Sequence, residues 1–266
     1  MSVKIVAHRG ESLIAPENTL EAFTLAWARG AQCIEGDFHL TADGVVVCMH
    51  DDNALRTCGV ERSLAKMTLA EIKELDAGRY MGEAWRFTRV PTLAEVLDTM
   101  PDYGEIFIEL KSAGAIIEAI RSTFLQSSCR PEQLTFIAFD EETISETKRR
   151  LPAHNAYWLT CNWTGNWNAP GDPILNPDQL VHKIKALGVD GVDIARANFL
   201  DERFTGAFHA AGLSFNVWTV NEPEMAGRLA AANVDSITTD CARVIRTELG
   251  LQERRRNQIV DCLQLA

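Results

Sequence analysis

The chain has 266 residues, of which 46% are hydrophobic and 24% are charged, and its formal net charge at pH 7 is −11. This length and composition are typical of a globular domain whose core needs neither disulfides nor a structural metal to fold. The acidic balance argues against DNA or RNA as a partner, because a polyanion is repelled unless a basic surface compensates, and a basic run such as Arg254–Arg256 is only three residues long.

The N-terminal residues and the cysteines indicate a cellular compartment. Lys4 is not followed by an apolar stretch of signal-peptide length, and the sequence has no run of 18 apolar residues. We therefore expect no leader and no membrane span. The seven cysteines are scattered and form no C-x-x-C pair. This pattern is typical of reduced thiols, so it predicts a cytoplasmic protein without a disulfide framework or a zinc site.

Strand-like segments recur along the chain, each a short apolar run bounded by turn-forming residues. There are eight of them, at residues 3–7, 33–38, 105–110, 134–138, 156–160, 190–194, 214–219 and 235–239. Helical patterns lie between most of these segments. Strands that alternate with helices predict a parallel sheet. The count of eight predicts an α/β fold closed into a (β/α)8 TIM barrel, which usually takes about 250 residues.

Capping patterns predict where several helices begin and end. The starts carry a capping residue three positions before a glutamate, at Asn18, Thr68, Thr92 and Asn221. For Asn18, a contact to a neighbouring functional residue is a second interpretation. Glycines that can terminate a helix stand at three expected ends, Gly30, Gly188 and Gly212.

One interruption of the alternation follows the second strand. Residues 41–44 predict a tight turn into an extra strand at 45–49. The segment from about 53 to 90 comes before the next barrel helix and contains a helix start of its own. We interpret it as a small insertion on the barrel.

A second interruption is the loop at 161–176, which is rich in Gly, Pro, Asn and Trp. Long loops of this kind lie over the carboxyl-end face of a barrel, where active sites are built, so Trp163 and Trp167 are candidates for lining a pocket. We expect residues 1–250 to form the single barrel domain. Residues 251–266 are predicted to be a tail, either an extra helix or a contact in a homo-oligomer.

Chemically capable side chains gather at the ends of the first strands. Residues i and i+2 of a strand point to the same side, so Glu35 shares a face with Asp37, and Glu109 with Lys111. The carboxyl ends of all barrel strands meet at one rim. The side chains that can converge there are His8, Arg9, Glu35, Asp37, His50, Glu109 and Lys111.

This set of residue types predicts the cleavage of a phosphate ester. Three converging carboxylates repel one another unless a cation lies between them, and ligands that are all oxygen favour Mg²⁺ or Ca²⁺. Arginine and lysine suit the phosphate of a small anionic substrate. The two histidines offer an acid and a base that titrate near neutral pH.

The same residues resemble the glycerophosphodiester phosphodiesterase family. The match runs in order from residue 3 to about 245. It is carried by His8-Arg9-Gly10, Pro16-Glu17-Asn18-Thr19, Glu35-x-Asp37, His50-Asp51, Arg56-Thr57, Leu75-Asp76-Ala77-Gly78, Pro91-Thr92-Leu93, Glu109-Leu110-Lys111, Val217-Trp218-Thr219-Val220-Asn221 and Thr239-Asp240. The chain departs from the family pattern at Gly36, where an aliphatic residue is typical.

The resemblance implies a role for each candidate residue. His8 and His50 are the implied acid/base pair, and the implied ligands of one divalent cation, Mg²⁺ or Ca²⁺, are Glu35, Asp37 and Glu109. Arg9 and Lys111 are expected to hold the phosphate and Trp218 to pack against the glycerol carbons. The insertion would be the small cap seen in these enzymes.

The implied reaction is hydrolysis of a glycerophosphodiester to sn-glycerol 3-phosphate and an alcohol. Two alternatives stay open at this point. A related phosphodiesterase could act on lysophospholipids, in some cases as a cyclising transferase, and a non-catalytic barrel could hold a phosphorylated ligand. The released alcohol, the choice between Mg²⁺ and Ca²⁺, and the division of acid and base between His8 and His50 are also left open.

Overall fold

Eight parallel strands close into a barrel in the computed structural model, which describes residues 3–161 and 176–251. The strand order is β1-β9-β8-β7-β6-β5-β4-β2, and pairing of β1 with β2 closes the ring. The barrel strands are β1 (Lys4–His8), β2 (Cys33–Leu40), β4 (Glu105–Leu110), β5 (Leu134–Ala138), β6 (Asn155–Thr160), β7 (Gly191–Ala195), β8 (Ser214–Trp218) and β9 (Ser236–Thr239). The predicted TIM barrel is confirmed.

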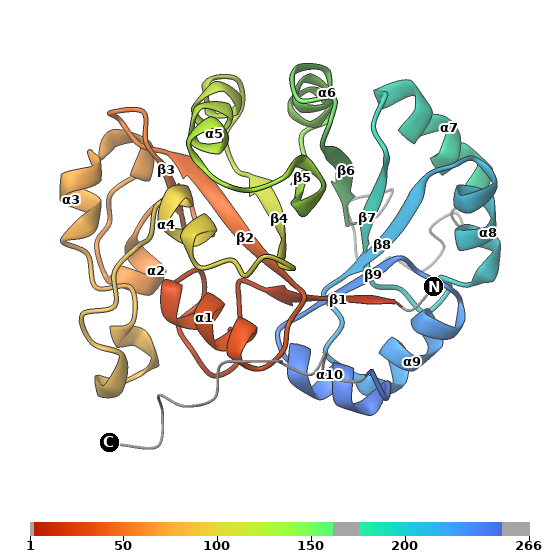
Figure 1. The fold of residues 1–266 in the computed structure, drawn as a ribbon, viewed down its shortest axis with the longest axis horizontal. Coiled ribbons are helices and arrows are strands. Elements are labelled where there is room, and N and C mark those ends of the chain that lie inside the picture. Colours follow the sequence, from red (N-terminus) through yellow and green to blue (C-terminus); the bar gives the residue numbers. More distant parts are fainter. Residues whose placement is uncertain (1–2, 162–175, 252–266) are drawn as a thin grey trace.

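Helices surround the strands, as Figure 1 shows. Those that follow barrel strands are α1 (Leu20–Ala28), α5 (Ala115–Gln126), α6 (Glu141–Arg150), α7 (Pro177–Leu187), α8 (Glu202–Ala210), α9 (Pro223–Ala231) and α10 (Ala242–Glu248). A one-turn 3-10 helix, η4 (Pro131–Gln133), leads into β5. None of the helices in the described part of the chain is long and apolar enough to cross a membrane.

The apolar runs become strands that are covered on both faces. All five residues of β5 are buried. A large cluster fills the space between strands and helices, where Phe208 packs edge-on against Phe215 at 5.0 Å between ring centroids. A smaller cluster inside the barrel includes Phe107 and Tyr157. Burial on two sides explains why these strands read as continuous apolar runs rather than as alternating ones.

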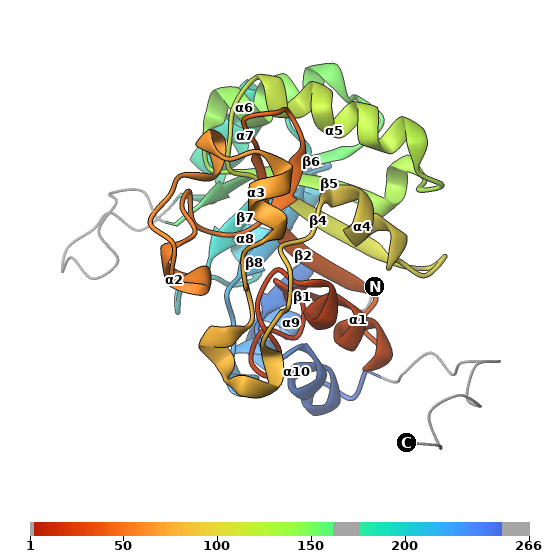
Figure 2. The ribbon, with the colours of Figure 1, turned by 90° about the vertical axis from the view of Figure 1, so that its left-hand side faces the viewer.

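A hairpin leads into the insertion. β3 (Val46–Cys48) pairs antiparallel with β2. The chain then forms α2 (Leu55–Cys58), η1 (Leu64–Lys66), α3 (Leu69–Lys73), η2 (Arg79–Met81) and η3 (Glu83–Trp85) before α4 (Leu93–Asp98). These elements have a hydrophobic cluster of their own, which includes Leu64, Met67 and Ile72. Figure 2 shows α2 and α3 on the outer side of the barrel strands.

The structure tests the predicted helix starts. Thr68 and Thr92 form complete capping boxes with Glu71 and Glu95, as predicted. The other two N-caps were wrong by one residue, because Thr19 caps α1 and Glu222 precedes α9. The amides of the two asparagines bind carboxylates of the site instead, as described below.

Some expectations fall on other parts of the chain. Trp163 and Trp167 and the tail from residue 252 lie outside the described residues. Their predicted roles, and the division into one domain and a tail, therefore stay predictions.

Candidate active site

A cavity of about 90 Å³ opens at the carboxyl ends of the barrel strands. Its lining includes seven of the eight residues predicted from the sequence, namely His8, Arg9, Glu35, His50, Glu109, Lys111 and Trp218. The eighth, Asp37, contacts the Lys111 ammonium group at its edge. The structure therefore brings the whole predicted set together, although their chemical roles stay predictions.

The three carboxylates form one buried cluster. Asp37 lies beside Glu109 in the register of β2 and β4, and Glu35 is two residues earlier on β2, so all three point into the barrel mouth. One oxygen atom of each lies within 4.8 Å of the others. The exposed fractions of the three residues are 8% or less.

The charge balance of this cluster fits a divalent cation. Burial, together with Asp37 and Glu109, raises the pKa of Glu35 well above its usual range, and burial beside Asp37 raises the pKa of Glu109 to about 8. Glu35 Oε1 is buried and has no hydrogen-bond partner. Crowded carboxylates with an orphaned oxygen are short of positive charge, and donors that are all oxygen suit Mg²⁺ or Ca²⁺.

Two positively charged side chains flank the carboxylates. Lys111 Nζ lies 2.6 Å from Glu109 Oε1 and 3.0 Å from Asp37 Oδ1. Arg9 Nε lies 3.2 Å from Asp37 Oδ2. Although burial alone would raise the pKa of the Asp37 carboxyl group, Lys111 and Arg9 hold it well below its usual range. Asp37 is thus kept ionised between two groups that can also face a phosphate.

His8 is oriented from the far end of the sequence. Its Nδ1 lies 2.6 Å from Asp240 Oδ1, just after β9, and its Nε2 lies 3.9 Å from Glu35 Oε2. Asn221 donates a hydrogen bond to the other Asp240 oxygen at 2.6 Å. Because Asp240 engages Nδ1, Nε2 is the nitrogen that can exchange a proton with a substrate.

His50 has a corresponding carboxylate partner. Its Nδ1 lies 2.7 Å from Asp51 Oδ1. Arg56, on α2, donates to Asp51 through Nε at 2.7 Å and to both oxygens of Glu17 at 2.7 and 2.8 Å. Burial lowers the pKa of His50, which favours its neutral form at pH 7. Each histidine is therefore presented with its Nδ1 engaged and its Nε2 available.

Unusual backbone at the end of β1 places these groups. Arg9 adopts a φ of 56° and Gly10 a φ of 84°. A Cβ atom on Gly10 would lie 2.6 Å from the backbone carbon of Ala22, so only glycine fits there. Asn18, which also has a positive φ of 58°, donates from Nδ2 to Asp37 Oδ2 at 2.7 Å. Asn18 thus makes the contact that its second interpretation predicts, whereas the role of Asp37 stays a prediction.

Trp218 forms part of the wall of the cavity. Its Nε1 donates to the backbone carbonyl of Asp193 at 3.0 Å. Its ring meets Phe139 edge-on, with centroids 5.6 Å apart. These contacts fix the indole at the end of β8, where its face can cover carbon atoms of a ligand.

The sequence matches known proteins along most of its length. Residues 8–243 match the model of the glycerophosphoryl diester phosphodiesterase family. The chain belongs to this family of enzymes. A glycerophosphodiester phosphodiesterase of Caldanaerobacter subterraneus subsp. tengcongensis is 30% identical over 245 residues, which cover 90% of this chain and 95% of the relative.

Solved structures of glycerophosphodiester phosphodiesterases and related enzymes share the fold. A phosphodiesterase of Oleispira antarctica, in complex with its product sn-glycerol-3-phosphate, aligns with a TM-score of 0.81 at 27% identity and covers 94% of this chain and 97% of its own. The glycerophosphodiester phosphodiesterase of Thermotoga maritima aligns with a TM-score of 0.70 at 26% identity, with coverages of 93% and 98%.

The sequence analysis did not assign partners to His8 and His50. Asp240 and Asp51 both lie in motifs that carried the resemblance, yet neither was assigned a task. For Asp51 the signal was its place directly after His50. For Asp240 the signal was the position of this residue at the end of the last strand. That strand lies beside the first strand once the barrel closes.

Proposed function

We propose that this phosphodiesterase hydrolyses glycerophosphodiesters to sn-glycerol 3-phosphate and an alcohol, with one divalent cation and two histidines. The observation that carries the proposal is a cavity whose lining brings His8 and His50 together with Glu35 and Glu109 of the carboxylate cluster. The relatives named for this substrate class support it. The scattered free thiols favour the cytoplasm as its location.

The chain's own residues divide the work. Glu35, Asp37 and Glu109 would hold the cation, and Arg9 and Lys111 would bind the phosphate oxygens. When bound, Mg²⁺ or Ca²⁺ supplies positive charge that polarises the phosphoryl group. One histidine removes a proton from the nucleophile, which is either water or the glycerol 2-hydroxyl, and the other protonates the departing alcohol. The 2-hydroxyl route passes through a cyclic phosphate.

The Asp–histidine pairs make this proton transfer feasible. A carboxylate at Nδ1 fixes the tautomer and stabilises the imidazolium that forms when Nε2 takes a proton. Asp240 does this for His8 at 2.6 Å and Asp51 for His50 at 2.7 Å. Since the two sites are built alike, their geometry is compatible with either direction of proton transfer.

The test is a substrate panel with defined metals. Purified protein is incubated with glycerophosphocholine, glycerophosphoethanolamine or a lysophosphatidylcholine, with Mg²⁺ or Ca²⁺, and the release of glycerol 3-phosphate and free alcohol is measured. We expect turnover of the glycerophosphodiesters. Turnover of only the lysophospholipid would change the substrate class, and binding without turnover would point to a binding barrel.

Histidine variants test the proposed acid/base pair. His8→Ala and His50→Ala should each lower kcat by roughly 10²–10⁴-fold in a folded protein. His209→Ala is the matched control, because this histidine is bonded to Asp235 at the opposite end of the barrel. Near-normal turnover in a folded His8→Ala, His50→Ala double variant would contradict the assignment.

A further inference from the structure

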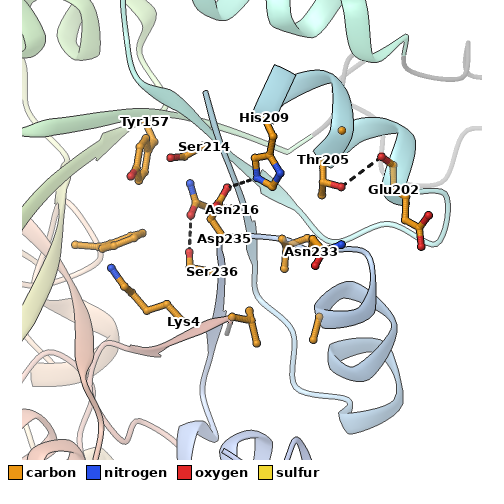
Figure 3. A pocket seen from close by; sticks show the side chains of 15 residues that line it. Lys4, Tyr157, Glu202, Thr205, His209, Ser214, Asn216, Asn233, Asp235 and Ser236 are labelled. Carbon is orange, nitrogen blue, oxygen red and sulfur yellow. Dashed lines mark hydrogen bonds and ion pairs between the residues drawn. The ribbon is translucent and has the colours of Figure 1, made fainter. Parts of the chain in front are cut away.

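A second cavity lies at the opposite, amino-terminal end of the barrel. It has a volume of about 630 Å³. Figure 3 shows that polar side chains lining it pair with one another: His209 lies 3.1 Å from Asp235, and Ser236 donates to Asn216 at 2.7 Å. Among the described residues that line it, none has a buried side-chain atom without a partner. No buried polar atom in the described lining of this cavity therefore indicates a missing ligand.

The floor of the active-site cavity differs in this respect. Asp193 on β7 and Thr238 on β9 both line it. Their exposed fractions are 1% and 2%. Asp193 Oδ1 and Thr238 Oγ1 are buried without a hydrogen-bond partner. Around them the floor is apolar, with Ile137 and Leu159.

Neighbouring polar residues show that the barrel can satisfy such groups. Asn216 is the register partner of Asp193 on β8, and it is also the register partner of Ser236 on β9. The amide of Asn216 donates to the backbone carbonyl of Val192 at 3.0 Å and accepts from Ser236. Buried polar atoms are generally paired in this way, because an unpaired one is costly. The exceptions at Asp193 and Thr238 therefore call for a partner from outside the chain.

The position of the two residues defines that partner. The charged groups that suit a phosphate stand at the rim, whereas Asp193 and Thr238 lie on the floor below them, beside the wall formed by Trp218. A carboxyl group and a hydroxyl group, next to apolar side chains, suit a short carbon chain that carries hydroxyl groups. A carboxyl oxygen accepts a hydrogen bond from a hydroxyl whether the carboxyl is charged or neutral.

We propose that Asp193 and Thr238 recognise a hydroxyl group of the polyol esterified to the substrate phosphate, and so select polyol phosphodiesters over hydroxyl-free ones. This inference rests on the proposed function and adds two specificity residues to it. Sites built to hydrogen-bond a substrate hydroxyl discriminate strongly against an analogue that lacks it, because their own groups are then left unpaired.

Binding measurements with two ligands test the proposal without relying on turnover. Titration calorimetry in the presence of Mg²⁺ compares sn-glycerol 3-phosphate with propyl phosphate, which has the same three carbons and phosphate but neither hydroxyl. We expect the wild type to prefer glycerol 3-phosphate by at least about 10-fold in Kd. Thr238→Val and Asp193→Leu should each raise the Kd for glycerol 3-phosphate about 10-fold. The Kd for propyl phosphate should stay within about 3-fold of the wild-type value.

Further variants separate recognition from structure. Asp193→Asn keeps an acceptor oxygen and should restore most of the preference that Asp193→Leu loses. Thr135→Val is the matched control, because Thr135 is a buried barrel threonine that is absent from the lining of this cavity. A specificity role also predicts that Thr238→Val keeps or raises the midpoint of thermal unfolding, since it removes an unpaired buried group. If Asp193→Leu does not fold, the binding of the two ligands by Thr238→Val tests the proposal on its own.

Two outcomes overturn the inference. One is a wild type that binds the two ligands equally or binds neither. The other is a Thr238→Val variant that binds both ligands more weakly by the same factor, or whose affinity for both is unchanged. Hydrolysis of glycerophosphocholine by the same preparation reports separately on the proposed function, so a failure of one proposal is distinguishable from a failure of the other.

Discussion

At the scale of single residues, the site is organised by pairs in which a carboxylate holds a histidine. Asp240 contacts His8 Nδ1 and is itself held by Asn221, so its orientation is fixed from two sides. Although partial burial opposes ionisation, the hydrogen bond from His8 lowers the pKa of Asp240 to about 2. Asp240 is therefore an anion at any pH at which the enzyme would work.

Replacing Asp240 by Asn should lower kcat by roughly 10²–10⁴-fold while the protein stays folded. An amide can donate to Nδ1 and so favours the tautomer with its proton on Nε2, which cannot act as a base. The measurement is steady-state kinetics with glycerophosphocholine. Asp235→Asn, which alters the matched pair with His209 at the other end of the barrel, is the control. Equal effects of the two substitutions would contradict the prediction.

The same pair makes a prediction about acid stability. Because the pKa of Asp240 is depressed in the folded state, its carboxylate stabilises the fold above the unfolded-state pKa of about 4. This contribution is lost as the pH falls through about 2. Urea unfolding should therefore show a stability gap between wild type and Asp240→Asn at pH 5 that closes toward pH 2. A gap that is constant over this range would contradict the assigned shift.

At the scale of elements, the insertion contributes to the site through α2. Arg56 reaches from this short helix to Asp51, next to His50, and to Glu17 in the loop after β1. Its two carboxylate partners thus come from separate segments of the chain, and the guanidinium group bridges them. The insertion is in this way coupled to the orientation of His50.

Replacing Arg56 by Lys should lower kcat by about 10-fold with a small change in stability. A lysine keeps the charge but loses the planar fork that binds two carboxylates at once. Because Arg56 is partly exposed, we expect the free energy of unfolding to change by less than about 1 kcal/mol. Arg62→Lys is the control, since Arg62 binds Glu71 in the same insertion. An unchanged kcat would show that Asp51 keeps its orientation without Arg56.

Elements were the part of the structure that the sequence predicted best. The alternating strands and helices could be recognised in the sequence because strands buried on both faces leave continuous apolar runs, as at 134–138. The N-caps Thr68 and Thr92 could be recognised because the glutamate partner of each is three residues away. Asn18 and Asn221 fit the same local pattern but bind distant carboxylates, which a local pattern does not record.

At the scale of the whole molecule, much of the site depends on barrel closure. The positions of the eight candidate residues followed from strand ends that share one rim. The contact between His8 and Asp240 joins residues 232 apart in the sequence, and only the pairing of β1 with β9 explains it. Asp193 looked like an ordinary polar residue in a strand, because the lack of a partner for its oxygen is visible only in three dimensions.

The acidic cluster predicts that a divalent cation stabilises the whole fold. A ligand that binds only the folded state at 100 times its Kd adds about 2.7 kcal/mol, which corresponds to a rise in Tm of roughly 5–10 °C for a chain of this size. Differential scanning calorimetry with Mg²⁺ or Ca²⁺, against NaCl of equal ionic strength, measures it.

Glu35→Gln provides the matched variant for this experiment. It should lose most of the gain in Tm with the cation and should melt higher than the wild type in EDTA, because it removes one of three mutually repelling carboxylates. A wild-type Tm that neither Mg²⁺ nor Ca²⁺ changes would argue against a metal site at this cluster.

The pairing of β1 with β9 also has a consequence for how the enzyme is made. The first strand and its histidine are synthesised before any other barrel strand, whereas the carboxylate that orients this histidine follows the last strand. A nascent chain that ends before residue 240 therefore lacks the complete His8–Asp240 pair, however well its earlier segments have folded. Hydrolytic activity should therefore appear only after nearly the whole barrel has been translated.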